Sequence, residues 1–339
     1  MQTTSQPLPQ KRLLVLTLLL CAVSLLTAML ANYWRSSRIG IQEVHFMGEA
    51  QGTYYAITYF DTLGRNLQPQ VDSILQAFDK VASLWDTASE INAVNHNRDI
   101  ELSPMFQDLF HKSMEISVLT DGAFDITVGP LVKAYGFWNQ EQEDLTDEKI
   151  AHYLRLVGYQ KVRIENNRFI KDIPDIQIDF NAIAQGYSAD VLSQFFENQS
   201  IYNYLIDVGG EIIANGQKPN GSHWVVGIEV PAQNKDDDRT IFTKIELKDR
   251  SIVTSGNYRK YYEKDGKRYA HTIDPKTGKP AEHNLLSVSV IDSTAWRADA
   301  LATAMMVLGV QQAQQLAQRI QGLETYFICA EGTELRLLR

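Results

Sequence analysis

An aspartate and a threonine four residues apart are the side chains of this sequence best spaced to hold a metal ion. They are Asp299 and Thr303, within the stretch from Asp292 to Ala304. Asp292 or Ser293 is a suitable N-cap for a helix here, and helix residues four apart share one face. A carboxylate beside a hydroxyl suits Mg²⁺, which prefers oxygen ligands. The same spacing also fits an aspartate on a solvated face, with Thr303 bonded to its own helix.

A second segment could bind phosphate. An apolar stretch typical of a strand leads to Asp179, and small residues then open a helix before Asp190. Small side chains at a strand-to-helix turn let a ligand approach backbone amides, and helix N-termini favour phosphate. A tightly packed turn without any ligand explains the same residues, so this segment alone decides nothing.

Two further segments carry polar groups near aromatic or turn residues. In residues 120–131, Phe124 and Asp125 could hold a planar ring by its face and its polar edge, although Phe124 also fits a core position. In the turn-like segment 271–278, His271 is the histidine best placed to act near phosphate. A lone histidine is more often structural, so neither segment is specific by itself.

The elements that must position these residues follow from hydrophobic periodicity. Apolar residues recur at helical spacing in 67–85, and the pattern predicts further helices near 103–120, 182–197, 294–308 and 310–320. Residues 53–60 have the aromatic and β-branched composition of a strand, and 161–172 predict a hairpin that turns at Asn166-Asn167. Strands and helices alternate without regular βαβ repetition. The sequence therefore predicts an α+β fold in one continuous domain.

The N-terminus predicts a membrane segment. Lys11-Arg12 precedes an uncharged run from Leu13 to Ala31, which is long enough to span a bilayer. We expect a cytoplasmic N-terminus at 1–12, a signal-anchor or signal segment at 13–34, a linker at 35–44 and a globular domain at 45–339. An uncleaved anchor, a cleaved signal and lipidation at Cys21 remain alternatives. The expected location is the inner (cytoplasmic) membrane, with the domain facing the periplasm or cell exterior.

The net charge argues against nucleic acid as a partner. The chain of 339 residues carries a formal net charge of −9, so no basic surface for nucleic acid is expected. The chain has two cysteines, Cys21 and Cys329, without CxxC spacing, so a thiolate metal site is not expected. An acidic protein that binds an anionic ligand needs local help from a metal ion or from helix termini.

Taken in order, seven segments resemble the FAD:protein FMN transferases, also known as the ApbE family. The similarity covers roughly residues 45–330, in the blocks GTYYAI, SLWDTASEINAVN, DGAFDITVGPL, IDFNAIAQGYSAD, YLIDVGGEI, SIVTSGNYRKYYEKDGKRYAHTIDPKTGKP and WRADALATAMMVLG. Seven ordered blocks outweigh any single motif. The resemblance implies an ApbE-like domain that binds FAD and Mg²⁺ and transfers FMN through a phosphoester bond to a threonine or serine hydroxyl of a partner, releasing AMP.

The resemblance also implies roles for particular residues. Metal ligands would be Ala184, Asp299 and Thr303, with Ala302 as a further carbonyl ligand. The FAD contacts would fall on Gln51, Trp85, Ala123, Phe124, Asp125, Asn181, Tyr187 and Ile273. Two residues depart from the family pattern: Gln51 stands where many members have methionine, and Gln185 stands where many have lysine. The second departure removes a positive charge beside the phosphates.

The implied partners are acceptor subunits of extracytoplasmic or membrane redox complexes. Attack by a neutral hydroxyl on a pyrophosphate needs charge neutralisation and a base, so His271 is the candidate base while Asp299 holds the metal. The alternatives are a Mg²⁺-dependent FAD pyrophosphatase that releases FMN and AMP, a protein that binds FAD without chemistry, and an envelope protein with a decayed site.

Overall fold

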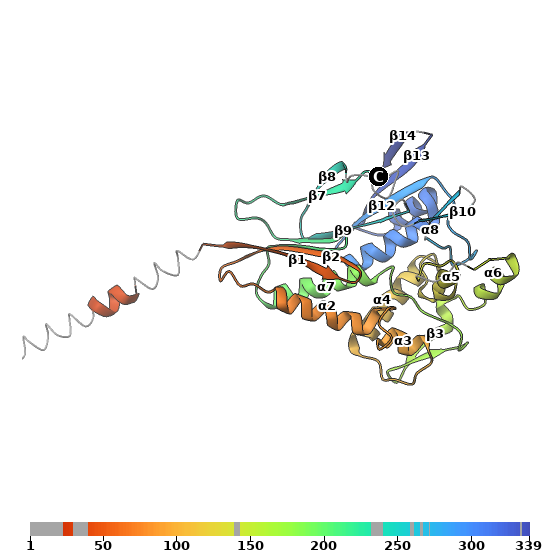
Figure 1. Ribbon diagram of the computed structural model, residues 1–339. Coiled ribbons are helices and arrows are strands. Elements are labelled where there is room, and N and C mark those ends of the chain that lie inside the picture. The colour runs from red at the N-terminus through yellow and green to blue at the C-terminus, as the bar shows by residue number, and fades with distance from the viewer. Residues whose placement is uncertain are drawn as a thin grey trace, which may run out of the picture.

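The structure is a computed structural model (Figure 1). It describes residues 23–29, 40–138, 143–231, 240–257, 261–264, 267–270, 272–332 and 334–339, with the backbone alone for 261–264 and 267–270. Among these residues, no helix combines the length and the apolar character that a membrane span requires. The expected segment 13–34 falls mostly outside the described residues, as does Cys21.

The centre of the fold is an eight-stranded sheet in which every neighbouring pair is antiparallel. Its spatial order is β1-β2-β5-β6-β9-β12-β13-β14, so the two edges are β1 and β14. The strands are β1 Gln42–Ala50, β2 Thr53–Asp61, β5 Tyr204–Val208, β6 Glu211–Asn215, β9 Arg250–Gly256, β12 Leu285–Asp292, β13 Glu324–Glu331 and β14 Glu334–Leu338.

Burial along the strands follows their places in the sheet. In β2, every second side chain is buried, and Tyr55, Ile57 and Tyr59 are fully inaccessible. Alternation of this kind is typical of a strand whose one face meets the core. In β12, an inner strand between β9 and β13, residues of both faces are buried. The sheet is therefore covered on both sides at its middle.

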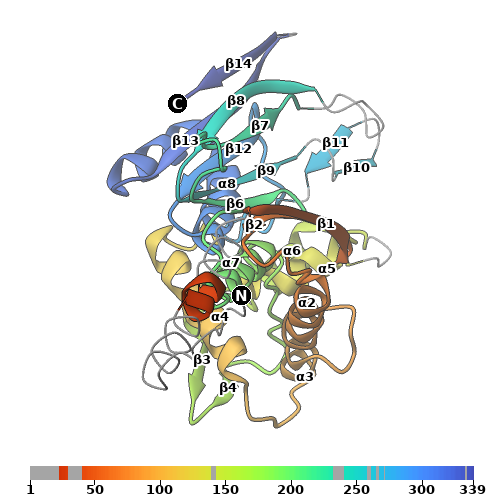
Figure 2. The same ribbon diagram turned by 90° about the vertical axis from the view of Figure 1, so that its left-hand side faces the viewer.

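Helices cover one face of the sheet (Figures 1 and 2). Helices α7 and α8 pack directly against its strands, and α2 and α4 pack against those two helices. Short helices α3, α5 and α6 extend this layer. The helices are α2 Gln68–Ala82, α3 Glu90–Asn95, α4 Pro104–Leu119, α5 Gly129–Ala134, α6 Asp147–Leu154, α7 Ala184–Asn198 and α8 Ala295–Arg319.

A hairpin covers the other face. It consists of β7 Trp224–Glu229 and β8 Ile241–Leu247, and inward side chains of β7 alternate with exposed ones. Trp224 stacks on Phe60 of β2 with ring centroids 5.8 Å apart. The remaining short elements are β3 Val162–Glu165, β4 Arg168–Lys171, β10 Tyr261–Lys264, β11 Lys267–Ala270 and the 3₁₀ turns η1 Ile126–Val128 and η2 Tyr159–Lys161.

The structure confirms the predicted α+β class and most predicted elements. The hairpin at 161–172 turns at Asn166 and Asn167, both with positive φ. The two helices predicted at 294–308 and 310–320 are the two parts of α8, which is kinked at Gly309 with φ 70° and ψ 170°. The first strand begins at Gln42, inside the expected linker at 35–44.

The cap of α8 differs from the predicted one. The N-cap residue is Thr294, whose side chain makes no capping bond, rather than Asp292 or Ser293. The Asp190 carboxylate, from α7, instead accepts hydrogen bonds from the backbone N–H of Ala295 (3.1 Å) and Trp296 (2.7 Å). A cap supplied by another helix leaves no local pattern, so sequence spacing could not reveal it.

Asp190 gives the first testable prediction, a pH-dependent contribution to stability. Burial raises its pKa from 3.8 to about 6, against the opposing effect of the two N–H bonds. Because the folded state holds this proton more tightly than the unfolded state, the contribution is present below about pH 4 and is lost as pH rises through about 6. The unfolding free energy of the wild type minus that of Asp190→Asn should therefore fall across this window in urea titrations. A pH-independent difference would contradict the assignment.

Candidate active site

The N-terminal turn of α7 meets α8 at the predicted metal ligand Asp299. Asp299 is 5% exposed, and its Oδ2 accepts a hydrogen bond from the backbone N–H of Gly186 at 3.0 Å. Ala184, another predicted ligand, is the first residue of α7 and is also buried. The contact depends on glycine, since a Cβ at position 186 would lie 2.4 Å from the carbonyl oxygen of Ala295. The structure thus places Ala184 and Asp299 at one helix junction.

Thr303 lies one turn after Asp299 on α8 and is half-buried. Its Oγ1 lies 3.4 Å from the Oγ of Ser255 on β9, so a sheet strand adds a hydroxyl beside it. Ala302 is fully buried within the helix. The predicted i, i+4 face is therefore directed at a helix–sheet junction rather than at open solvent.

This donor set fits Mg²⁺ in the presence of a phosphate ligand. The described residues contain no group of three or more His, Cys, Asp or Glu side chains that could hold a metal. One carboxylate, one hydroxyl and backbone carbonyls are all hard oxygen donors, and Mg²⁺ sites often combine one or two protein carboxylates with substrate phosphates. The residues present accordingly suit a site that a pyrophosphate completes.

The tight turn between β1 and β2 lies beside the first turn of α7. Gln51 and Gly52 form this turn with φ of 54° and 71°. Gly209, with φ 67°, approaches closely from the end of β5: a Cβ there would lie 2.6 Å from Nε2 of Gln185 and 2.7 Å from Cγ2 of Thr53. The positive φ at position 209 favours glycine. The turn that contains Gln51 and the side chain of Gln185 therefore lie close together, on either side of Gly209.

The side-chain amide of Gln51 is a candidate contact for a ligand. Both its Oε1 and Nε2 are buried, and neither has a hydrogen-bond partner among the described residues. Buried polar groups are normally paired, because an unpaired one costs about 1–3 kcal/mol. A ligand with polar groups, such as the FAD that the resemblance implies, would satisfy this amide.

Gln51→Leu gives the second prediction. The substitution keeps the size of the side chain and removes the orphaned amide, so the free energy of unfolding should stay the same or rise. If the amide bonds FAD, the dissociation constant for FAD should increase about tenfold, the value of one hydrogen bond. Thermal melts and flavin-fluorescence titrations measure the two quantities. A destabilised variant with unchanged FAD affinity would show that the amide has a structural role instead.

Ala123, Phe124 and Asp125 are all buried. Asp125 accepts hydrogen bonds from the N–H (2.8 Å) and Oγ1 (2.6 Å) of Thr127 and from the N–H of Tyr159 (2.7 Å). Burial raises the pKa of its carboxyl group despite these bonds. Asp125 therefore anchors the loop, and any contact with a ring ligand would come from the loop as a whole.

Asp179 joins this loop to the start of α7. Its backbone N–H donates to the carbonyl of Ile126 at 2.7 Å, and its carboxylate accepts from the N–H of Asn181 (2.7 Å) and from Nε1 of Trp138 (2.9 Å). Burial raises the pKa of Asp179 as well. Asn181 itself is exposed. The sequence analysis did not identify Trp138 as a partner of Asp179. The one available signal was that a buried indole N–H usually needs a hydrogen-bond acceptor.

Three other predicted FAD contacts lie in different surroundings. Tyr187 is buried, stacks on Phe78 and donates its hydroxyl to Asp108 at 2.8 Å, so its side chain faces α2 and α4. Ile273 is buried against Leu131, Tyr135 and Val157. Trp85 follows the end of α2 with 58% of its surface exposed, which leaves its ring open to a ligand.

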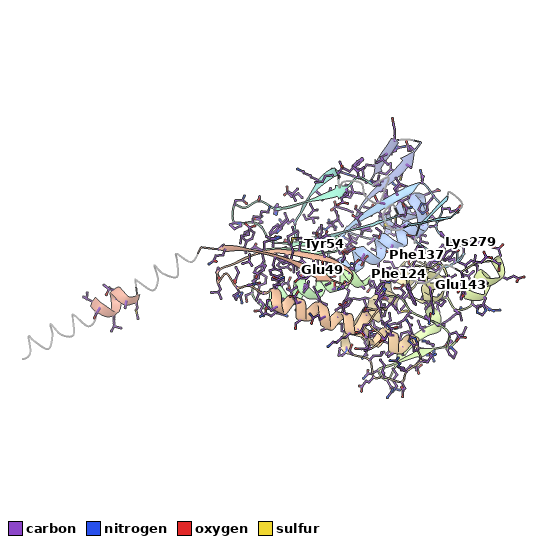
Figure 3. All side chains as sticks on the ribbon, viewed as in Figure 1. Glu49, Tyr54, Phe124, Phe137, Glu143 and Lys279 are labelled. Carbon is purple, nitrogen blue, oxygen red and sulfur yellow. The ribbon has the colours of Figure 1, made fainter. Side chains whose placement is uncertain are left out.

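His271, the predicted base, lies outside the described residues. The segment that follows it forms ion pairs with residues of the helical layer. Lys276 pairs with Asp121 (Nζ to Oδ2, 2.6 Å) and Lys279 pairs with Asp147 (Nζ to Oδ1, 2.9 Å). Figure 3 shows Lys279 on the same side of the molecule as Phe124, Phe137 and Glu143, whereas Tyr54 and Glu49 lie toward β1 and β2.

Comparisons with known proteins agree on one family. Residues 51–327 match the ApbE family. The chain is 35% identical over 289 residues to an FAD:protein FMN transferase of Vibrio cholerae, covering 83% of this chain and 86% of the relative. A relative of the same name from Escherichia coli strain K12 is 35% identical over 301 residues, with 85% of each chain covered.

Solved structures are similar as well. The flavin transferase ApbE of Vibrio cholerae superposes with a TM-score of 0.78 at 32% identity, over 88% of this chain and 97% of that one. The flavinyl transferase ApbE of Pseudomonas stutzeri gives a TM-score of 0.78 at 34% identity, over 88% and 94%. The sequence blocks and the three-dimensional arrangement thus point to the same relatives.

Proposed function

The chain belongs to the ApbE family, and from this premise we infer that it is an enzyme that transfers the FMN moiety of FAD to a target protein. We propose in addition that the acceptor is a threonine or serine hydroxyl, that AMP is released and that the reaction needs Mg²⁺. The observation that supports the finer proposal is the bond between the Gly186 N–H and the Asp299 carboxylate, because it holds Asp299 next to the start of α7, where Ala184 lies.

The proposed step is a substitution at phosphorus. The acceptor oxygen forms a bond to the phosphorus of the FMN half, and the bond from that phosphorus to the bridging oxygen breaks. AMP leaves with the bonding electron pair, and the hydroxyl proton passes to a base. We propose His271 for that role.

The chain's own groups would bind and orient the pyrophosphate. Asp299 and Thr303, with the carbonyl groups of Ala184 and Ala302, would hold Mg²⁺, which when bound supplies charge neutralisation for the phosphates and the leaving group. The N-terminal end of α7 favours negative charge through the helix dipole, although the N–H groups of Ala184 and Gly186 already donate to the Phe180 carbonyl and to Asp299. Gln185 is neutral, so on this side the helix terminus would have to favour the phosphates without help from a cationic side chain at that position.

We propose that this chemistry takes place outside the cytoplasm. The apolar run from Leu13 to Ala31 behind Lys11-Arg12 supports attachment to the inner membrane, with the domain on its outer side. Acceptor subunits of membrane or extracytoplasmic redox complexes are the partners that this location and the resemblance favour.

One assay separates the candidate functions. The purified protein is incubated with FAD, Mg²⁺ and a solubilised membrane fraction of its source cells, and the products are followed by in-gel flavin fluorescence and by AMP release. A fluorescent protein band, with AMP, supports the transferase. Free FMN and AMP without a labelled protein would indicate the pyrophosphatase, and FAD binding without AMP would indicate a binding protein. Mass spectrometry of the labelled band then identifies the modified residue.

A further inference from the structure

Strand β1 is a free edge of the main sheet, since among the described strands it pairs with β2 alone. Its nine residues run from Gln42 to the turn at Gln51, which borders the first turn of α7 (Figure 1). An unprotected edge of this length can bind another extended chain through backbone hydrogen bonds.

Neighbouring bonds define which backbone groups of β1 point outward. The N–H of Gly209 donates to the carbonyl of Tyr54 at 2.9 Å, on the β5 side of β2. The backbone N–H and carbonyl of Tyr54 therefore point away from Glu49, its partner residue on β1. At the other end of β2, the N–H of Phe60 bonds the carbonyl of Asn203 at 3.0 Å. Because pairs alternate in an antiparallel ladder, the outward-facing residues of β1 are Glu43, His45, Met47 and Glu49.

Most of these outward groups are available to a partner. Gln68 donates its Nε2 to the carbonyl of Met47 at 3.0 Å. Among the described residues, the outward backbone groups of Glu43, His45 and Glu49 have no protein partner. The side chains of all these strand residues are exposed, and Met47 is 57% exposed. A strand added here could therefore form hydrogen bonds with the backbone groups of three residues, which flank the apolar side chain of Met47.

The charges of this edge limit what can bind. If the β1 strands of two molecules paired, Glu43 and Glu49 of one would repel the glutamates of the other. The same charges disfavour a bound segment with acidic residues at the facing positions. The edge also leads directly to the candidate active site. At about 3.3 Å per residue, Glu49 lies about 7 Å along the chain from Gln51, whose buried amide has no partner in the part of the chain that the structure describes.

We infer that the acceptor segment of the target protein binds as an added strand along β1, with uncharged or basic residues across from Glu43 and Glu49. Its next residues then lie beside the Gln51 turn, where the hydroxyl can reach FAD. Backbone pairing holds the segment extended. This inference rests on the proposed transfer to a protein hydroxyl.

Proline substitution tests this docking mode and is the third prediction. His45→Pro removes one outward N–H and blocks strand addition, while the backbone bonds of β1 to β2 remain. The substitution also removes the side-chain hydrogen bond between His45 Nδ1 and Thr58 Oγ1, which is 2.9 Å long. The matched control is Leu335→Pro, because Leu335 faces outward on the opposite edge strand, β14. The probe is a synthetic peptide that spans the residue found to carry FMN in the assay above. The measured quantities are kcat/KM for the peptide, FAD affinity and the melting temperature.

Docking on β1 predicts that His45→Pro lowers kcat/KM for the peptide about tenfold or more, the effect of losing one or two hydrogen bonds, with FAD affinity unchanged. Leu335→Pro should transfer FMN normally. If His45→Pro unfolds, Glu49→Lys serves instead: it should lower kcat/KM for a peptide with a basic residue at the facing position and raise it for the acidic variant of that peptide. Unimpaired transfer by a folded His45→Pro, or no charge preference in Glu49→Lys, overturns the docking mode. A wild-type protein that labels no protein at all overturns the proposed function itself.

Discussion

Asp299→Asn should lower the rate of Mg²⁺-dependent FMN transfer by at least about a hundredfold, because several kcal/mol of charge stabilisation depend on the metal. Asparagine retains an oxygen that can accept the hydrogen bond from the Gly186 N–H, so the helix junction should persist. The substitution therefore removes the charge and leaves the packing. Labelling of the acceptor protein and release of AMP, both measured against Mg²⁺ concentration, report the loss.

The control is a second buried aspartate with a structural role. Asp61 is 4% exposed and pairs with Arg65 at the opposite end of β2 from the Gln51 turn. Asp61→Asn should lose stability and keep the transfer rate of the folded fraction. Asp299→Asn should show the reverse pattern. Normal transfer by Asp299→Asn at low Mg²⁺ would refute the metal assignment.

Gly186→Ala should be the most damaging single-methyl substitution near the site. The new Cβ would lie 2.4 Å and 2.7 Å from the carbonyl oxygen and carbon of Ala295 and 2.8 Å from Cβ of Asp299. Two of these atoms are backbone, so α7 and α8 must separate. Alanine gains about 1 kcal/mol of helix propensity over glycine, but overpacking costs typically about 1–3 kcal/mol or more and should prevail.

The separation should also reduce activity, because it moves Asp299 relative to the first turn of α7. A displacement of about 1 Å in an active site can cost about a hundredfold in rate. Urea unfolding and FMN transfer measure the two effects. Ser188→Ala is the matched control, because Ser188 lies on the same helix. Among the described residues its hydroxyl bonds only the carbonyl of Gln185, at 2.9 Å, so both quantities should change little. Wild-type activity in Gly186→Ala would mean that the junction does not position the metal ligand.

The predicted elements with regular periodicity agree well with the structure. The apolar spacing in 67–85 corresponds to α2, where Val71, Leu75 and Phe78 are buried, and the composition of 53–60 corresponds to β2. Periodicity succeeds here because each element buries one face against a continuous core. The spacing of apolar residues along the element therefore matches its burial pattern.

Elements whose ends depend on distant residues were predicted less well. The kink of α8 could be anticipated as a break between two helices, but its cap could not, because Asp190 lies over a hundred residues earlier. The bond from Trp138 to Asp179 joins residues 41 positions apart in the same way. Neither pairing has a spacing that sequence rules can detect.

The same division applies to the site. The sequence by itself determined which residue types were present: a carboxylate and a hydroxyl on one helix face, a small-residue helix start and, through seven ordered blocks, the family. Only the tertiary structure decided that Gly186 joins that helix start to Asp299 and that Ser255 lies beside Thr303. It also showed that the amide of Gln51 has no partner among the described residues. Local propensity and periodicity are properties of neighbouring residues, whereas a site is a set of distances between segments that only the packing of helices against the sheet brings together.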